Sequence, residues 1–279
     1  MSSELQIVRG SSITVWGFAC CAIVAAAVAL PTNKEIAHGL IVDGNFKDAR
    51  VRLIGLHAQG AGDIHSAIAL HQLHLGFGDL NQADQVIQEV LQKQPANVEL
   101  LKRAARFYKQ VQNPAKRLEI LVRLLNISPT SETLDEALLI LRLEDNYEGE
   151  KAVLGRFANS PVLKVAHHER LGNLFARDQK LELAVRHFVR SDAMSGVPNW
   201  RLRFALFRIL LLQQRFSQSR SFMEQWLSEE IDHNQLSLFY KEAIDAKRLQ
   251  LAQLIIKEAL RRNHISQADA VSLRRGARE

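Results

Sequence analysis

Three histidines are the side chains of this sequence best placed to carry out chemistry. His65, His71 and His74 are close in sequence, and on a helix the i, i+3 pair His71 and His74 would face the same way. Such a pair could bind a metal ion. Carboxylate partners at a fixed spacing are lacking, so we favour the interpretation that these imidazoles pack inside the fold.

The motifs that mark common catalytic centres are missing from the sequence. There is no HExxH, GxSxG, P-loop or GxGxxG pattern, and the acidic residues form no convergent pair for acid–base catalysis. Both cysteines, Cys20 and Cys21, lie in one apolar run, so the remainder has no thiol for a disulfide or a cysteine–zinc site. We therefore expect no enzyme, no cofactor and no metal site.

A group of cations offers binding chemistry instead. Lys102, Arg106 and Lys109 are spaced four and three residues apart, with Arg103 beside Lys102, so on a helix they would share one face. Such a face could bind an acidic peptide, a C-terminal carboxylate or an anionic glycan. The alternative is a merely solvated face in a chain of formal net charge +6. Nucleic acid is not expected as a partner, because both signs of charge alternate and no aromatic–basic platform occurs.

The elements that must hold these residues follow a regular repeat. Gly44 and Ala49 recur 34 residues later as Gly78 and Ala83. Glycine permits a tight turn between two helices, and a small alanine lets the second helix approach the first. Apolar positions keep helical spacing throughout, and the alternation typical of strands is absent. The sequence therefore predicts an all-α array of stacked units.

This repeat resembles the tetratricopeptide repeat. The family's large, small and proline positions are occupied in the unit from Ile64 by Leu70, His74, Ala83, Ile87, Val90 and Pro95, and in the unit from Val98 by Ala104, Ala105, Tyr108, Leu121, Leu124 and Pro129. The resemblance implies a right-handed α-solenoid of about seven helical hairpins. It is loosest over residues 132–162, where Leu138, Leu141, Ala152 and Phe157 are the predicted core.

In this family the first helix of each unit lines a concave groove with its exposed face. The resemblance places Lys102, Arg106 and Lys109 in groove positions, with Arg103 adjacent. It adds Arg208 if the weaker repeat around residues 206–226 is aligned in the same way. The predicted partner-binding groove comprises Lys102, Arg103, Arg106, Lys109, Asn173, Arg177 and Lys241.

Residues 11–30 form an apolar run without a charge. As a helix, a run of this length just spans a hydrocarbon core of about 30 Å. Two interpretations remain open: a permanent single-pass anchor, which we favour because the run is longer than a typical signal core, and a secretory signal cleaved near Ala27-Val28-Ala29. The predicted organisation is a flank at 1–10, an anchor at 11–30, a solenoid at 31–262, and a capping helix with a basic tail at 263–279.

The resemblance implies a non-catalytic scaffold of the bacterial inner membrane that recruits partner proteins of an envelope assembly. Exopolysaccharide synthesis and export is the first hypothesis. Alternatives are a periplasmic chaperone-like module, an anionic-glycan-binding module, and a cytochrome or envelope-protein assembly factor. Cations are almost balanced across the apolar run, with Arg9 before it and Lys34 after it. The periplasmic side is therefore only preferred for the repeats, and the cytoplasmic side stays open.

Overall fold

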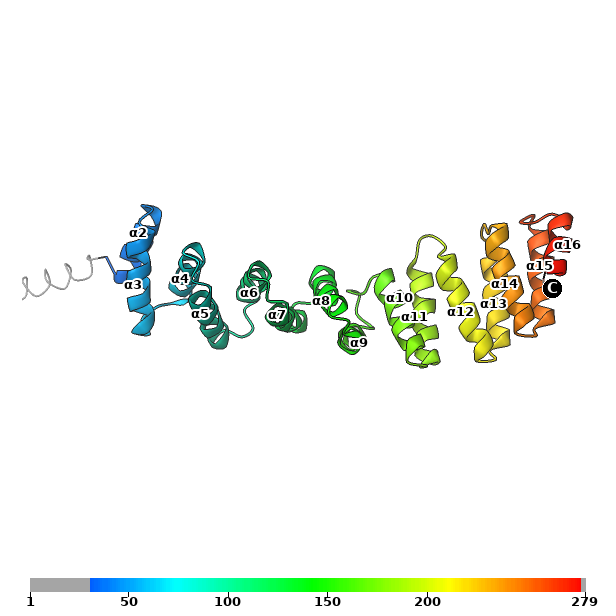
Figure 1. Ribbon diagram of the computed structural model, residues 1–279, viewed down its shortest axis with the longest axis horizontal. Coiled ribbons are helices and arrows are strands. Elements are labelled where there is room, and N and C mark those ends of the chain that lie inside the picture. The colour runs from blue at the N-terminus through cyan, green and yellow to red at the C-terminus, as the bar shows by residue number, and fades with distance from the viewer. Residues whose placement is uncertain (1–30, 277–279) are drawn as a thin grey trace, which may run out of the picture. The chain divides into compact units, whose positions relative to one another are not determined.

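The chain is helical wherever its structure is described. A computed structural model describes residues 31–276, so the predicted anchor at 11–30 lies outside the described residues, as do 277–279. Between 31 and 276 the chain forms fifteen α-helices, α2 to α16, and no strand (Figure 1). None of these fifteen helices combines the length and the apolar character needed to span a bilayer. The described chain divides after Ser128 into two compact units.

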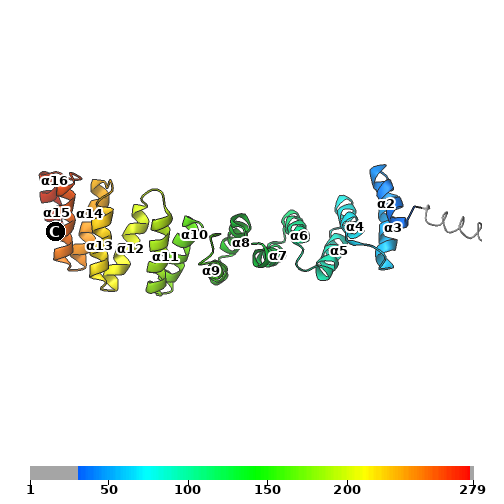
Figure 2. The same ribbon diagram turned by 180° about the vertical axis from the view of Figure 1, so that it is seen from behind.

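The first unit consists of three antiparallel helical hairpins. They are α2 (Asn33–Val42) with α3 (Phe46–Ala58), α4 (Ile64–Gly76) with α5 (Leu80–Lys93), and α6 (Val98–Gln110) with α7 (Pro114–Ile127). Consecutive hairpins are neighbours in both views, since α3 packs on α4 and α5 packs on α6 (Figures 1 and 2). Each hairpin therefore buries its apolar face on the next one.

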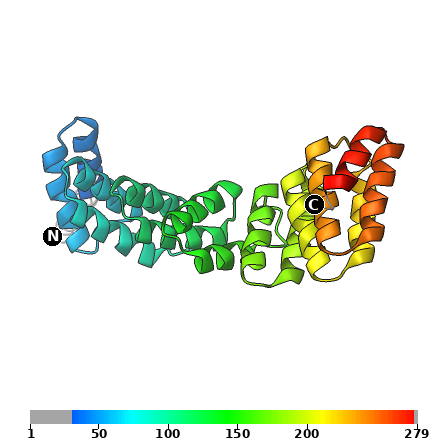
Figure 3. The same ribbon diagram turned by 45° about the vertical axis from the view of Figure 1, so that its right-hand side comes forward.

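The second unit continues the pattern with four hairpins and a final helix. They are α8 (Ser131–Leu143) with α9 (Tyr147–Arg156), α10 (Val165–Arg177) with α11 (Leu181–Met194), α12 (Trp200–Leu212) with α13 (Phe216–Trp226), α14 (His233–Asp245) with α15 (Leu249–Arg261), and α16 (Gln267–Gly276). Helix α16 packs on α15, at the red end of the chain in Figure 3. The described residues thus contain the predicted number of hairpins, and the all-α fold class is confirmed.

Each hairpin closes with a left-handed backbone turn. Gly44 and Gly78 have φ angles of 77° and 79°. The N–H of the residue after Gly78 donates to the carbonyl of His74 at 2.8 Å, and the corresponding bond after Gly44 reaches Leu40 at 2.8 Å. This is the Schellman arrangement, which ends a helix and reverses the chain. The predicted role of both glycines is therefore confirmed. The other five hairpins place non-glycine residues in this conformation: Gln112, Asp145, Gln179, Gln214 and Lys247.

Small side chains hold the two helices of a hairpin together. Ala49 and Ala83 are fully buried, as is Ala184 at the equivalent position of α11. On α10, Gly172 faces the ring of Phe188 so closely that an added Cβ would lie 2.5 Å from a ring carbon. These positions are points of close approach, which explains why the small residues recur at the repeat spacing.

Two hairpins depart from this rule with a charged residue at the small position: α7 has the half-buried Arg117, and α9 has a fully buried carboxylate. That carboxylate is Glu150, and its side chain is 1% exposed. Arg142 donates from Nε to the carboxylate at 2.6 Å, and Arg170 donates from Nη2 at 2.5 Å. Burial alone would raise the pKa of Glu150, but hydrogen bonds from the two guanidinium groups hold it below its usual range. This carboxylate thus joins α8, α9 and α10.

The predicted core of the same hairpin was correct only in part. Leu138 and Leu141 are buried as expected. Ala152 is exposed, so its assignment to the core was wrong, and Phe157 is only half-buried. Leu154 fills the core instead. The error has a physical cause. The repeat positions were assigned from the spacing of apolar residues, and the buried carboxylate interrupts that spacing.

We expect Gly78→Ala to destabilise the first unit by about 1 kcal/mol, because alanine at positive φ is strained. The added Cβ would meet no atom within 4 Å, so the backbone alone causes the loss. Gly55→Ala inside α3 is the control, where the new Cβ also meets nothing. It should stabilise the helix by about 1 kcal/mol. Urea unfolding measures the free energy of unfolding of both variants. If Gly78→Ala is as stable as the parent chain, the assigned turn is contradicted.

Candidate functional site

Helix α6 presents a cationic face opposite its buried side. The helix begins after Asn97, whose side chain accepts hydrogen bonds from the N–H groups of Glu99 and Leu100. Its buried side contains Leu100, Leu101, Ala104, Ala105, Phe107 and Tyr108. The four predicted cations lie away from that side: Lys102, Arg103, Arg106 and Lys109. Three of them are exposed, and Arg103 is half-buried. The structure therefore brings these four predicted residues together on one helix.

Most of this charge is not neutralised within the fold. Lys102 pairs with Glu99 of the same helix at 3.2 Å, with both side chains more than half exposed. Arg106 donates from Nε to the backbone carbonyl of Lys102 at 3.4 Å. Within residues 31–276, Arg103, Arg106 and Lys109 form no ion pair. These three cations remain available for an external anion.

A shallow hollow with an apolar floor adjoins the cationic face. It lies where the starts of α4 and α6 face each other, and Ile64, Ile68 and Leu100 contribute its apolar surface. Arg103 lines the same hollow, so a guanidinium group lies at its edge. The remaining lining is polar: Asp63, His65, Gln94, Asn97 and Glu99. An apolar side chain and a neighbouring carboxylate could be held together at this place.

The other predicted groove residues lie in the second unit. Asn173 and Arg177 are on α10, and Lys241 is on α14, with the α12 hairpin between them in sequence. Arg177 lies over the ring of Tyr147, 4.1 Å from its centre, so it also serves the packing of the unit. Asn173 and Lys241 are exposed. Arg208 on α12 pairs with Glu242 at 3.2 Å. These residues are spread over separate helices, and their role in a groove stays a prediction.

The histidines considered for metal binding are structural. The imidazole of His71 is buried and lies 2.9 Å from the carbonyl oxygen of Ala83, on the other helix of its hairpin. His74 is also buried, and desolvation lowers the pKa of both histidines. The interpretation of packed imidazoles is confirmed for His71 and His74. His65 is exposed beside the hollow. No three metal-binding side chains come together among the residues with described positions.

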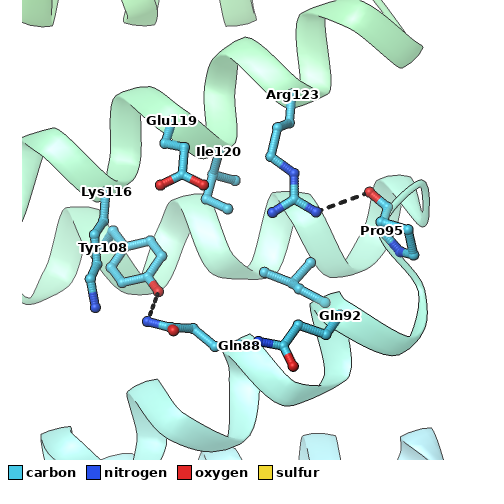
Figure 4. Close-up of a pocket in the computed structure, with 9 residues that line it drawn as sticks. Gln88, Gln92, Pro95, Tyr108, Lys116, Glu119, Ile120 and Arg123 are labelled. Carbon is cyan, nitrogen blue, oxygen red and sulfur yellow. Dashed lines mark hydrogen bonds between the residues drawn. The ribbon is translucent and has the colours of Figure 1, made fainter.

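A second hollow, between α5 and α7, is lined by polar groups, several of which are engaged in internal hydrogen bonds. Figure 4 shows Gln88 and Gln92 facing Glu119 and Arg123, with the ring of Tyr108 between the two helices. Arg123 donates to the carbonyl of Pro95 at 3.2 Å. The hydroxyl of Tyr108 donates to Asp84 at 2.6 Å. Burial raises the pKa of Tyr108, and this hydrogen bond raises it further. These polar groups join neighbouring hairpins, so we do not assign them a ligand.

A buried histidine pair in the second unit has no signal in the sequence pattern. His168 of α10 and His187 of α11 place their Nδ1 atoms 3.1 Å apart, and both rings are buried. Phe175 stacks on His187 at 5.5 Å. Burial lowers the pKa of His168 to about 4 and also lowers the pKa of His187; the cations Arg186 and Arg190 act in the same direction. The two residues are 19 positions apart, and only the hairpin fold reveals their contact.

Comparisons with known proteins bear on the fold. No family model and no curated protein matches the sequence. A tetratricopeptide repeat protein from Parabacteroides merdae is 16% identical over 88% of this chain and 98% of its own, with a TM-score of 0.37. PilW, described as a type IV pilus biogenesis factor, is 19% identical over 76% of this chain and 99% of its own, with a TM-score of 0.35. A chain of Naa15/Naa10 bound to HypK-THB is 11% identical over 88% of this chain and 39% of its own, with a TM-score of 0.50.

The fold class follows from the hairpins themselves. Repeated antiparallel hairpins, each packed on the next, define an α-solenoid within each unit. The left-handed turn and the small buried residue recur at the spacing expected from the sequence, as in Gly78 and Ala83. The chain thus has an α-solenoid fold of stacked helical hairpins, which is the fold that the resemblance to the tetratricopeptide repeat implied.

The histidine pair should make the second unit sensitive to acid. The neutral imidazoles fit the buried site, whereas the unfolded chain binds protons with ordinary pKa values near 6.5. The stabilisation is therefore complete above pH 6.5 and is lost as the pH falls toward about 4. Urea unfolding between these limits, followed through the fluorescence of Trp200 and Trp226, measures the loss.

The double variant His168→Leu with His187→Leu is the control for this pH dependence. It removes both imidazoles from the buried site, so its unfolding free energy should change less with pH than that of the parent chain. Identical pH slopes for the variant and the parent would show that these histidines do not cause the acid sensitivity.

Proposed function

We propose that this protein is a non-catalytic, membrane-tethered scaffold whose α6 face binds an acidic segment of a partner protein. The observation that carries the proposal is the set of unpaired cations Arg103, Arg106 and Lys109 on one exposed helix face of the described structure. Exposed cations of this kind attract a carboxylate-rich chain, and the attraction weakens as salt is added.

The hollow beside the cations favours a peptide over an anionic glycan. A glycan would use only the charges, whereas an apolar peptide side chain could also cover Ile64, Ile68 and Leu100. Burying one such side chain contributes roughly 1.5–3 kcal/mol, more than a single exposed ion pair at about 1 kcal/mol or less. We therefore propose a segment that combines acidic residues with one apolar residue.

The proposed tether is the apolar run at residues 11–30. A single-pass anchor would hold the α6 face near its partners and raise their effective concentration. The setting proposed for this work is an envelope assembly at the bacterial inner membrane, with the repeats on the periplasmic side. Exopolysaccharide synthesis and export is the assembly that we propose first, because an anionic polymer and its handling proteins would suit a basic scaffold.

Charge reversal on α6 should release the partner. In the triple variant Lys102→Glu, Arg106→Glu and Lys109→Glu, all three side chains are exposed, so the fold should persist. We expect the affinity for the partner segment to fall at least about tenfold, because attraction becomes repulsion at three positions. Co-purification from solubilised membranes, followed by titration of the isolated partner at low and high salt, measures the effect.

A second triple variant controls for the change in net charge. Lys180→Glu, Arg201→Glu and Lys257→Glu reverse three exposed cations of the second unit, away from α4 and α6. This variant carries the same net charge as the α6 variant, so any long-range effect of charge should be equal in both. Retention of the partner by the α6 variant, or equal loss in both variants, would rule out the α6 face as the binding surface.

A further inference from the structure

The charge along the exposed face of α6 changes sign near the apolar hollow. Glu99 lies at the beginning of the helix, and Arg103 follows about one turn later, about 6 Å further along the axis. Both line the hollow, whose floor includes Leu100. Arg106 and Lys109 continue the cations toward the end of the helix. A ligand that lies along α6 therefore meets an acidic group first and cationic groups afterwards.

Asp63 adds a second carboxylate to the acidic end of the hollow. It precedes α4 and accepts hydrogen bonds from the N–H group of Ser66 at 2.9 Å and from the hydroxyl of Ser66 at 2.8 Å. These bonds lower the pKa of Asp63 to about 2, so its carboxylate is charged at neutral pH. Lys34 of α2 forms an exposed ion pair with this carboxylate at 3.1 Å. Asp63 is thus held in place at the rim, and its charge is partly balanced within the fold.

Glu99 is the carboxylate that can change its partner. Its side chain is 72% exposed, and its ion pair with Lys102 at 3.2 Å joins two exposed groups of one helix. Such pairs contribute little to stability, because both groups are well hydrated without each other. A ligand carboxylate on Lys102 would release Glu99, and a cation of the same ligand would then take the place of Lys102. One internal ion pair is thereby exchanged for two external ones.

A uniformly acidic ligand fits this arrangement poorly. Its apolar residue would cover Ile68 and Leu100 in the hollow, and an acidic residue on the side where α6 begins would face Glu99. Like charges that face each other across an interface repel and reduce affinity. A basic residue on that side would instead be attracted to Glu99, while the acidic residues on the other side reach Arg103 and the cations beyond it.

We propose that the segment bound by the α6 face carries a basic residue, an apolar residue and acidic residues, in that order from the start of α6 toward its end. The inference rests on the proposed function and specifies its ligand further. Glu99 selects the basic residue, and Arg103 binds the first acidic one. An extended chain advances about 3.3 Å per residue, so the two residues that flank one apolar residue lie about 7 Å apart, close to the spacing of Glu99 and Arg103.

Two peptides of identical composition test this order on the full-length chain in detergent. The first reads Lys-Leu-Glu-Ser-Glu-Glu-Ser-Ser-Ser, and the second carries its lysine after the three final serines. Acetyl and amide groups remove the terminal charges of both. At low salt, fluorescence anisotropy should show the first peptide binding about threefold more tightly than the second, which is the effect expected of one exposed ion pair.

The variant Glu99→Gln identifies the carboxylate responsible for this preference. The side chain keeps its size at an exposed position, so the fold should persist. This variant should bind the two peptides equally. Glu119→Gln changes an exposed residue of α7 in the same hairpin and makes the same change of net charge. It is the matched control and should keep the preference of the parent chain.

Each contrary result refutes a defined part of the proposal. Equal binding of the two peptides to the parent chain leaves the acidic ligand of the proposed function intact and refutes the order. A preference that survives in Glu99→Gln, or that is lost equally in Glu119→Gln, shows that Glu99 does not select the basic residue. If neither peptide binds the parent chain at low salt, the proposed function fails, and the inference fails with it.

Discussion

The whole array depends on one backbone constraint, the left-handed turn that joins the two helices of each hairpin. The turn fixes where the second helix starts, and thereby which residue of that helix meets the first one. Ala83 is fully buried because it lies five residues after Gly78, and Ala49 stands in the same relation to Gly44. A Schellman ending satisfies the carbonyl groups at the end of the first helix and reverses the chain in a few residues. Regular stacking is the consequence.

Stacking of this kind leaves a defined set of side chains for binding. In α6 the apolar residues are used for contacts within and between hairpins, so the opposite face is free to carry charge. The cations on it are not held in internal ion pairs of the kind that Arg142 and Arg170 form with Glu150. The buried charges of Glu150 and Arg203 are paired and serve the fold. The α6 charges are exposed, or half-buried in the case of Arg103, and serve, in our proposal, a partner.

The sequence was most informative where the repeat chemistry is strict. Gly78 and Ala83 could be assigned from their spacing because few residue types tolerate positive φ or a close helix contact. It was less informative at Gln112 and Lys247, which adopt the same turn. A non-glycine residue can do so at a cost of about 1–2 kcal/mol, and the packing of the hairpin offsets that cost without leaving a pattern.

The candidate site was predictable to a similar extent. The shared face of Lys102, Arg106 and Lys109 follows from helical spacing alone, so it could be read directly from the chain. The apolar hollow could not, because Ile68 and Leu100 meet only when α4 and α6 pack. The internal contact of Arg177 with Tyr147 likewise depends on the packing of two hairpins.

Site-specific photo-crosslinking in cells tests the central claim most directly. A photoreactive phenylalanine analogue replaces Gln72, an exposed residue of α4 at a groove position of the tetratricopeptide pattern, or Gln85, an exposed residue of α5. The account predicts an adduct from position 72 whose crosslinked peptide is rich in aspartate and glutamate, and no such adduct from position 85. An acidic adduct from position 85 alone, or none from position 72 in cells where the partner co-purifies, would contradict it.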